Sequence, residues 1–324
     1  MTATIGRDIT TLAELNLPLD ILPADIRAYV EPHIRMVEEV AVDLGSNLKV
    51  KVDGLRIDYP LEITELHLRA INNVVGRYTK SGRKGIKSTL HRVSGGRNTE
   101  ELPNKVSLRV ARVIYGIAEE MRPLIEAAKG VAVIGPPAVG KTTLLRDIGR
   151  IRLETISAGL VIVDSIGELC GYGDTPHPLL RRARIFPVGE PDRQGQQLEE
   201  AIRNHGAEEV MTDEVQKGDV PLLIEAYNNG VSCVCSLHGR GIRNVVKNEH
   251  RQILLGVIEN LRDGALHMRD DAIFQLIIEV HGRGLFRVIT DVPSAVRAVI
   301  AGEPVDYQYF GPWTETYKLE RSIY

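Results

Sequence analysis

A glycine-rich segment followed by lysine and threonine is the part of this sequence with the clearest chemical meaning. Gly135 is followed, after four residues, by Gly140, Lys141 and Thr142. Glycines let backbone N–H groups close on phosphate oxygens, and the positive end of a following helix adds to that attraction. The lysine reaches the β- and γ-phosphates and the threonine hydroxyl ligates Mg²⁺. The spacing therefore predicts a P-loop that binds ATP with Mg²⁺ and hydrolyses it, with nucleotide contacts from Gly135, Pro136, Pro137, Ala138, Val139, Gly140, Lys141, Thr142 and Thr143.

A pair of acidic residues follows a predicted strand further along the chain. Residues 209–212 form a short run that ends in Asp213 and Glu214. An acid at the end of a buried strand adjoining the P-loop can hold the Mg²⁺ shell, and an acid directly after it can polarise the attacking water. We therefore assign Thr142 and Asp213 as Mg²⁺ ligands and Glu214 as the catalytic base.

A second acidic segment competes for the role of base. The apolar run 160–163 leads into Asp164 and then Glu168. A strand inserted between the P-loop and the Asp-Glu strand is the layout of RecA-like and additional-strand ATPases, some of which carry the catalytic glutamate after the inserted strand. Glu168 is therefore the alternative base, although we favour Glu214. Without such a role, Asp164 and Glu168 would cap a helix or be solvated in a loop.

A histidine and a group of arginines complete the chemistry-bearing residues. His238 ends the apolar run 231–237, where a polar side chain would face the γ-phosphate and sense its loss. Arginine is suited to stabilising the charge of phosphoryl transfer, often from a neighbouring subunit. The cluster Arg181, Arg182 and Arg184 fits that role, although a solvated surface would explain it equally well.

The elements that must position these residues alternate between short apolar strands and helices. This alternation predicts an α/β fold with a parallel sheet, a RecA-like P-loop core, over residues 104–270. We expect strands at 131–134, 160–164, 209–212 and 231–237, and helices at 141–153, 194–205, 219–228 and 252–261.

The flanking segments have a different character. Residues 1–103 predict a small α+β domain, with helices at 22–44 and 63–78, a strand at 48–52, and a basic linker at 94–103. Residues 271–324 predict a hairpin at 273–280 and 285–290, a helix at 292–301, and an aromatic tail. That tail either packs on a core or docks a partner protein; its aromatic residues are Tyr307, Tyr309, Phe310, Trp313, Tyr317 and Tyr324.

Composition limits the class of protein. The 324 residues are 43% hydrophobic and 26% charged, which is typical of a soluble globular chain. No run of 18 apolar residues predicts a membrane span, and residues 1–4 do not start a signal peptide. Three cysteines fit a reducing cytosol, so a cytoplasmic location is expected.

Charge is unevenly distributed along the chain. The formal net charge is −3, yet residues 76–112 contain ten Lys or Arg against Glu100 and Glu101. Such a stretch is able to bind nucleic acid through phosphates. Only Tyr78 within it and Tyr115 just beyond are available for base stacking, which is sparse for a single-strand binder.

Taken together, these segments resemble the stage III sporulation protein AA family, and more closely its cyanobacterial and plastid relatives, the hypothetical chloroplast ATPases. The resemblance covers about residues 25–300. It is carried by residues 161–168, 173–178 and 182–184, and by 89–93, 109–112 and 237–239.

The resemblance implies a secretion-type ATPase with an N-terminal α/β domain, a RecA-like core and a hexameric ring that holds ATP at subunit borders. It also implies that arginines before the P-loop and near the inserted strand reach the neighbouring nucleotide, a role that falls to Arg92, Arg109, Arg182 and Arg184. Some plastid relatives end in a nucleic-acid module with an Arg-x₃-His signature. None follows Gly284, so no nucleic-acid role is inherited from that module.

Three functions therefore compete. The leading hypothesis is a ring-shaped motor ATPase that moves or remodels a macromolecule. The second is a single-stranded nucleic-acid translocase that uses residues 76–112. The third is a scaffold that binds ATP as an assembly switch, against which the intact Asp213-Glu214 pair argues.

Overall fold

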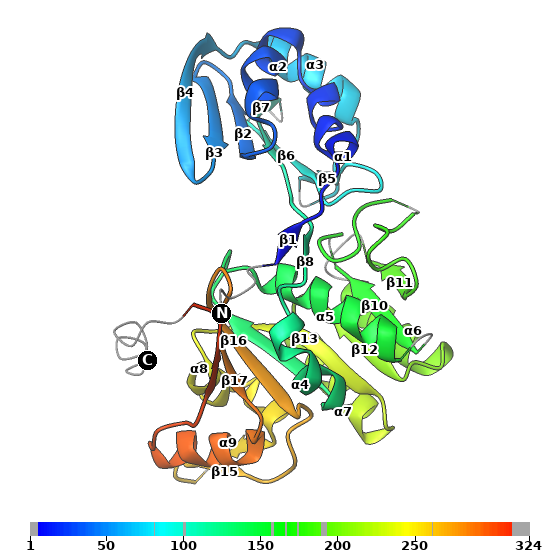
Figure 1. The fold of residues 1–324 in the computed structure, drawn as a ribbon, viewed down its shortest axis with the longest axis vertical. Helices are drawn as coiled ribbons and strands as arrows, with labels where there is room; N and C mark the ends of the chain where they lie inside the picture. The colour runs from blue at the N-terminus through cyan, green and yellow to red at the C-terminus, as the bar shows by residue number, and fades with distance from the viewer. Residues whose placement is uncertain are drawn as a thin grey trace. The chain divides into compact units, whose positions relative to one another are not determined.

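The computed structural model describes residues 6–80, 82–99, 102–156, 159–165, 167–173, 175–188, 193–260 and 262–312. The chain divides into two compact units. The N-terminal unit contains Asp8–Val113 and also Cys170–Pro178, a short segment that the chain contributes much later. The C-terminal unit contains Gly6, Arg7, Ile114–Leu169 and residues 179–312. Each unit has its own sheet (Figure 1).

The N-terminal unit is a six-stranded antiparallel sheet in the order β4-β3-β2-β7-β6-β5. Three short helices cover one face of it: α1 (Leu12–Asn16), α2 (Ala24–Val30) and α3 (Glu65–Val75) (Figure 1). The strands are β2 (Val37–Asp43), β3 (Asn47–Val52), β4 (Leu55–Glu62), β5 (Arg83–Gly85), β6 (Arg92–Arg97) and β7 (Pro103–Arg109). The two-residue strands β1 (Arg7–Asp8) and β8 (Ile114–Tyr115) lie at either end of this stretch of chain.

The predicted helix over 22–44 is wrong beyond Val30. Val37–Asp43 is strand β2, which lies inside the sheet between β3 and β7. Val40 and Val42 are buried on one face, as strand alternation requires, but a register irregularity between Val37 and Glu39 gives the apolar residues a helix-like spacing. The predicted linker 94–103 is also different, since residues 94–97 belong to β6 and Pro103 begins β7, its antiparallel partner.

The C-terminal unit contains an eight-stranded mixed sheet in the order β11-β10-β12-β13-β9-β16-β17-β18. The first six strands in this order run parallel, and β17 and β18 are antiparallel additions. The strands are β9 (Val131–Gly135), β10 (Leu160–Asp164), β11 (Arg184–Pro187), β12 (Glu209–Thr212), β13 (Ser232–His238), β16 (Leu276–Gly282), β17 (Leu285–Ile289) and β18 (Gln308–Phe310).

Helices cover both faces of this sheet. On one face, a core of strand residues packs against α6 (Gln194–Asn204), α7 (Val220–Asn228), α8 (Ile242–Val246) and α9 (Val292–Ala301). On the other face lies α5 (Lys141–Thr155), with α4 (Arg122–Ala127) beside it (Figure 1). Gly149 allows α5 to approach the sheet closely, because a Cβ there would lie 3.2 Å from the Met211 side chain.

The sheet confirms the predicted α/β class with a RecA-like core. One strand does lie between the P-loop strand β9 and the Asp-Glu strand β12, but in space that strand is β13. The strand at 160–164, which precedes β12 in sequence, lies beyond it as β10. The Asp-Glu strand therefore does not adjoin the P-loop strand directly.

The segment after β13 departs from expectation. Instead of a helix over 252–261, a single 3₁₀ turn at Gln252–Leu255 is followed by strand β14 (Val257–Glu259), paired with β15 (Leu266–Met268). Gly256 ends the turn with a left-handed φ of 71°, a conformation that glycine adopts without strain. The helix predicted over 292–301 coincides with α9.

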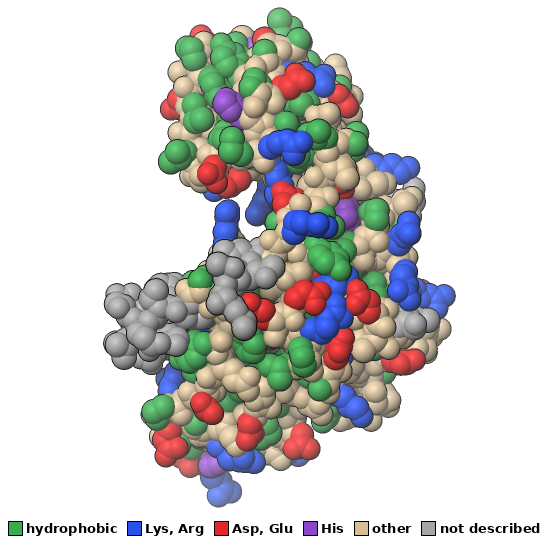
Figure 2. All heavy atoms as spheres, viewed as in Figure 1, with side chains coloured by type: hydrophobic (Ala, Val, Ile, Leu, Met, Phe, Trp, Pro, Cys, Tyr) green, Lys and Arg blue, Asp and Glu red, His purple; other side chains and the backbone are tan. Residues whose placement is uncertain are grey.

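Within the described residues, no helix is long and apolar enough to cross a membrane. All three cysteines of the chain are buried free thiols. Figure 2 shows hydrophobic, acidic and basic side chains interspersed on the face in view, without a single-sign field there.

Candidate nucleotide-binding site

The register of the parallel strands brings the predicted site residues to one edge of the C-terminal unit's sheet. His238 at the end of β13 pairs with Gly135 at the end of β9. On the next ladders, Thr212 pairs with Cys235 and Val163 with Thr212. Gly135, His238 and Asp164 therefore end neighbouring strands and Asp213 directly follows one, at the carboxyl ends where open α/β sheets bind ligands.

The P-loop backbone has the conformation that phosphate binding requires. Gly140 is the N-cap of α5 with φ of 108°, and Ala138 also has a positive φ of 61°. Gly135 is buried, and a Cβ there would lie 2.8 Å from Val139 Cγ1. Successive N–H groups in such a loop form a concave anion site, which the 15-residue helix α5 reinforces with its positive end.

Lys141 lies at the centre of the site. Its side chain is largely buried, and Nζ donates to the Pro136 carbonyl at 2.9 Å. Nζ also lies 3.2 Å from His238 Nδ1, which therefore acts as acceptor and leaves the proton on Nε2. Burial lowers the pKa of Lys141, while the charges of Glu214 and Glu168 act in the opposite direction.

His238 links the lysine to a predicted base. His238 Nε2 lies 2.9 Å from Glu214 Oε1, so the three side chains form a continuous series of contacts across the carboxyl ends of the strands. The Glu214 side chain is 48% exposed, which leaves it accessible to water. Its backbone is fixed on both sides: its N–H donates to Asp213 Oδ1 at 2.9 Å and its carbonyl accepts Gln194 Nε2 at 2.8 Å.

Asp213 lies deeper in the same edge. Its Oδ1 is 2.7 Å from the Ser165 hydroxyl, and its carbonyl accepts the Ser236 hydroxyl. Burial, followed by the neighbouring charges of Asp164 and Glu168, raises the pKa of Asp213 to about 7. A cation would relieve this crowding of carboxylates.

This donor set fits Mg²⁺. The described residues hold no cluster of three or more His, Cys, Asp or Glu side chains able to form a metal cage. Mg²⁺ does not need one, since it usually binds through one or two protein oxygens, substrate phosphates and water. The half-buried Thr142 at the start of α5 and Asp213 at the end of β12 offer a hydroxyl and a carboxylate of that kind.

Glu168 lies on the loop after β10, which α5 holds in place. Arg146 Nη2 donates to the Glu168 carbonyl at 2.5 Å and Nε to the Leu169 carbonyl at 3.0 Å. Asp164 Oδ2 accepts the Leu169 N–H at 3.2 Å. The charges of both Glu168 and Glu214 act on the pKa of Lys141, so both glutamates stay candidates for the base.

Several residues of the site were missed by the sequence reasoning. Gln194, the first residue of α6, is buried and donates from Nε2 to the Glu214 carbonyl and, at 2.7 Å, to Asp219 Oδ2. Ser165 contacts Asp213, and Arg251 donates to the His238 carbonyl at 2.7 Å. Only Ser165, adjacent to Asp164, gave a sequence signal, because the other two lie far from every motif.

The predicted arginines are not part of this cluster. Arg182 and Arg184 are exposed, Arg184 at the start of the edge strand β11, and neither forms an ion pair with the residues described. Arg109 is exposed on β7 of the N-terminal unit, where it pairs in register with Arg92 of β6.

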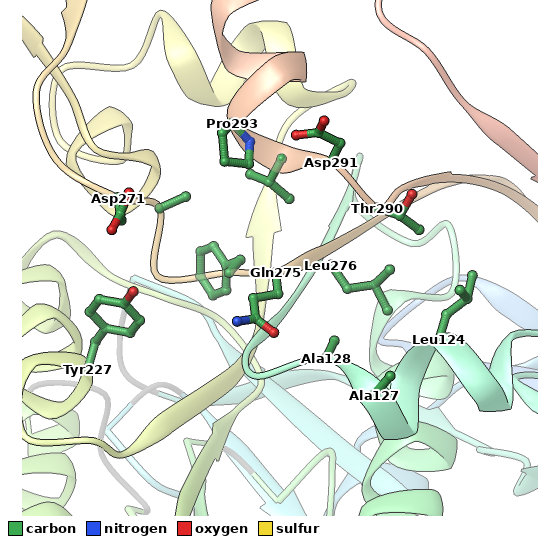
Figure 3. A pocket seen from close by; sticks show the side chains of 13 residues that line it. Leu124, Ala127, Ala128, Tyr227, Asp271, Gln275, Leu276, Thr290, Asp291 and Pro293 are labelled. Carbon is green, nitrogen blue, oxygen red and sulfur yellow. The ribbon is translucent and has the colours of Figure 1, made fainter.

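A hollow of about 490 Å³ lies at the other ends of the parallel strands, away from their carboxyl ends. Its lining includes Gln275 and Leu276 at the start of β16, Thr290 after β17, and Pro293 of α9 (Figure 3). Strand β9 runs from this end to the P-loop, so the five residues of the strand, roughly 15 Å, separate the two places. The hollow is no part of the nucleotide site.

Comparison with known sequences confirms the resemblance expected from the motifs. No protein-family model matches the chain. It is 33% identical over 313 residues to Protein SEEDLING PLASTID DEVELOPMENT 1 of Arabidopsis thaliana (91% of this chain, 46% of the relative). It is 30% identical over 306 residues to the uncharacterized protein ycf45 of Porphyra purpurea (89% and 54%). It is 32% identical over 150 residues to Stage III sporulation protein AA of Bacillus subtilis (44% and 48%).

Solved structures place the fold in a definite class. The chain is similar to the ATPase DotB of Legionella pneumophila, with a TM-score of 0.53 and 14% identity over 88% of this chain and 86% of that one. It is also similar to the pilus retraction motor PilT with bound ADP, with a TM-score of 0.54 and 14% identity over 91% and 85%.

The fold is therefore that of the P-loop secretion-type ATPases. Within that fold class, the homologues of the chain include the ycf45 plastid proteins and Stage III sporulation protein AA. The chain spans about half the length of the curated relatives named above.

Proposed function

We propose that this chain is an ATPase of the secretion-motor kind, which binds ATP with Mg²⁺ on the P-loop and hydrolyses it. The observation that carries the proposal is the contact chain from Lys141 through His238 to Glu214, beside the buried Asp213. A phosphate-binding lysine and an exposed carboxylate able to position water are recurring parts of phosphoryl-transfer sites, and here a histidine lies between them.

Each side chain has a distinct role in this proposal. Lys141 and the loop N–H groups bind the β- and γ-phosphates, and Mg²⁺, held through Thr142 and Asp213, adds charge stabilisation when bound. Glu214 orients the attacking water and accepts its proton. His238, which bridges Lys141 and Glu214, connects the state of the γ-phosphate to the position of the base.

Glu168 is the alternative base. It lies on a loop fixed by Arg146, and its charge reaches Lys141 as that of Glu214 does. We favour Glu214 because its side chain is exposed and its carboxylate lies 2.9 Å from His238 Nε2.

The proposal is tested by phosphate release from ATP with the purified chain. We expect turnover that requires Mg²⁺ and stops on chelation, and competition by ADP. Binding of a fluorescent ATP analogue without any phosphate release would instead favour the scaffold that uses ATP as an assembly switch.

We further propose that the active form is a ring, a hexamer in the leading version, that moves or remodels a macromolecule. DotB and PilT, whose fold the chain shares, are named as an ATPase and a pilus retraction motor. The exposed Arg109, Arg182 and Arg184 would then complete a neighbour's site by stabilising transition-state charge in trans.

A second candidate function is translocation of single-stranded nucleic acid, favoured by the register of the N-terminal sheet. Val93 of β6 and Val106 and Leu108 of β7 face the core of this unit. Because side chains alternate along a strand, their neighbours in sequence lie on the opposite face of the sheet. That face carries the basic residues Arg83, Arg92, Lys105 and Arg109, and also the acidic Glu39 and Asp43 of β2. Arg92 lies directly opposite Arg109, with Glu39 opposite Arg109 on its other side, so basic residues cluster at β6 and β7, where a phosphate would find partners.

The aromatic tail is only partly within the described residues. Tyr307 packs against Arg287, as expected of an arm folded on its own core, while Tyr309 is 38% exposed. Trp313, Tyr317 and Tyr324 lie outside the described residues. Docking of a protein partner on this segment stays a proposal.

A further inference from the structure

A buried ionic group lies in the C-terminal unit, outside the nucleotide site. Glu279 of β16 is 1% exposed. Its Oε2 accepts Arg287 Nη2 at 2.7 Å and Nε at 3.0 Å from the adjacent strand β17, and His281 Nε2 lies 3.3 Å from the same oxygen. The other oxygen, Oε1, accepts the N–H of Ile242, the first residue of α8, at 2.7 Å.

The carboxylate is packed directly against Gly241. The backbone of Gly241 is extended, with φ of 167°, which any residue can adopt. Space is what excludes a side chain, since a Cβ would lie 2.7 Å from Glu279 Oε1 and 3.1 Å from Cδ. Glycine stands at this position because the carboxylate occupies the volume of a side chain.

The turn that Glu279 holds leads straight from the nucleotide site. His238 begins it, in contact with Lys141 and Glu214, and Gly241 and Ile242 end it. Arg251 fixes the His238 carbonyl, and the Gly239 N–H donates to the Gly135 carbonyl at 3.4 Å. The turn 238–242 is therefore anchored by the P-loop strand at one end and by Glu279 at the other.

On its far side, the ionic group reaches the C-terminal strand. The Arg287 guanidinium lies over the Tyr307 ring, 4.4 Å from its centroid. Tyr307 precedes β18, the strand that pairs with β17 at the edge of the sheet. The contacts therefore run from the turn 238–242 to Glu279, from Glu279 to Arg287, and from Arg287 to Tyr307.

We propose that Glu279 is a positioning residue for hydrolysis, which fixes the turn 238–242 and thereby sets where His238 meets the γ-phosphate. The proposal rests on the nucleotide site described above. It assigns the Glu279–Arg287 pair a role in ATP turnover although neither side chain contacts the P-loop cluster. Misplacement of a positioned group by about 1 Å costs roughly a hundredfold in rate, so a small shift of this turn is sufficient to be measured.

Gly241→Ala tests this directly, because the added methyl group meets the carboxylate and leaves every site residue intact. We expect kcat to fall roughly ten- to a hundredfold with KM changed less than about threefold, the pattern of a lost transition-state interaction. The ratio of affinities for fluorescent ATP and ADP analogues should also move toward one, since His238 no longer distinguishes the γ-phosphate. Gly218→Ala is the matched control, because Gly218 is exposed and a Cβ there meets nothing within 4 Å.

The result is read only from variants that keep the wild-type far-UV circular dichroism and a cooperative melting transition. A folded Gly241→Ala with wild-type kcat and wild-type ATP-to-ADP ratio would overturn the proposal. If Gly241→Ala does not fold, Glu279→Gln is measured instead for kcat and for the ATP-to-ADP affinity ratio. This variant keeps the shape of the side chain and removes the charge that pairs with Arg287. The proposed function fails separately, and recognisably, if the wild-type chain releases no phosphate.

Discussion

At the scale of single residues, the site is defined by charges that share one small volume. Lys141 is surrounded by a carbonyl, an imidazole and two nearby carboxylates, and its burial lowers its pKa. The pKa of Asp213 moves in the opposite direction: burial and the charges of Asp164 and Glu168 raise it. Bound phosphates and a divalent cation would satisfy both groups at once, which is why these residue types occur together.

Two single substitutions test which glutamate is the catalytic base. Glu214→Gln should bind ATP normally and hydrolyse it at least about a hundredfold more slowly, the usual effect of losing a general base. The matched variant Glu168→Gln should retain most turnover. Single-turnover phosphate release measures both, and the reverse pattern would transfer the role of base to Glu168.

A second prediction at this scale concerns His91 in the N-terminal unit. His91 Nδ1 accepts the Ala111 N–H at 3.0 Å, and Nε2 lies 3.0 Å from the Glu14 carbonyl, so the buried ring is neutral. Burial is the main cause that lowers its pKa from 6.5 to about 4. Because protons then bind more tightly to the unfolded chain, stability is lost as pH falls from 6.5 toward 4.

His91 alone should therefore cost about 2 kcal/mol of unfolding free energy between pH 7.5 and pH 5. Urea unfolding at the two pH values measures the loss. In His91→Gln, which can accept and donate in the same places without titrating, the difference between the two pH values should shrink by that amount. An unchanged pH dependence in this variant would show that His91 is not the group responsible.

At the scale of elements, much of the parallel sheet could be predicted from the sequence because four of its strands, β9, β10, β12 and β13, are short, largely apolar runs, whereas β11 (Arg184–Pro187) has no such pattern and was not predicted. The strands β9, β10, β12 and β13 and the helices α5, α6, α7 and α9 fall close to the predicted ranges. Their order in space could not be read, because sequence does not say that β13 lies between β9 and β12. The distance of Asp213 from the P-loop depends on that order.

The N-terminal unit was harder to predict for a physical reason. An antiparallel sheet with one covered face relies on strict alternation, and the irregular register at β2 and the glycines at β6 break that pattern. The segment Cys170–Pro178 joins this unit through contacts such as His177 Nε2 with Glu14 Oε1 at 2.9 Å, residues 163 positions apart. A pattern within a short stretch of sequence cannot predict a contact between residues so far apart in the chain.

The packing of α5 gives a prediction at this scale. Asp147 is fully buried, accepts the N–H groups of Gly116 and Ala118 at 3.1 and 2.8 Å, and pairs with Arg150 at 2.7 Å. Asp147→Ala would leave two buried backbone N–H groups without an acceptor and remove one of the three carboxylates that pair with Arg150, so unfolding free energy should fall by about 2–5 kcal/mol. Arg203→Ala, which removes exposed pairs with Glu199 and Glu225, should cost about 1 kcal/mol or less by the same denaturation assay. Equal losses in the two variants would contradict this account of how α5 is held.

At the scale of the whole molecule, arginine variants test whether one subunit completes the nucleotide site of its neighbour. If Arg182 acts on a neighbour's nucleotide, Arg182→Ala subunits keep a sound P-loop and Lys141→Ala subunits keep a sound arginine. Mixing the two inactive proteins should then partly restore turnover, because some borders pair the intact halves. No recovery on mixing, together with monomers by light scattering at micromolar concentration, would exclude catalysis in trans.

Nucleic-acid binding is tested at the same scale. If the basic stretch 76–112 binds single strands, single-stranded DNA should raise the ATPase rate, and its affinity should fall steeply with salt. If Arg92 and Arg109 instead serve a neighbour's ATP, charge reversal at Lys80, Lys84 and Lys87 should leave turnover unchanged while loss of either arginine stops it. We favour the second outcome; stimulation by DNA that vanishes at high salt would establish the first.

The central claim is hydrolysis at the P-loop, and the most direct measurement is phosphate release by Lys141→Ala beside the wild-type chain. Lys129→Ala is the matched control, because Lys129 is an exposed lysine just before β9, the strand that leads to the P-loop. The account predicts Mg²⁺-dependent turnover in the wild type and in Lys129→Ala, and its loss, with weakened ATP binding and an unchanged fold, in Lys141→Ala. Wild-type turnover in Lys141→Ala would contradict it.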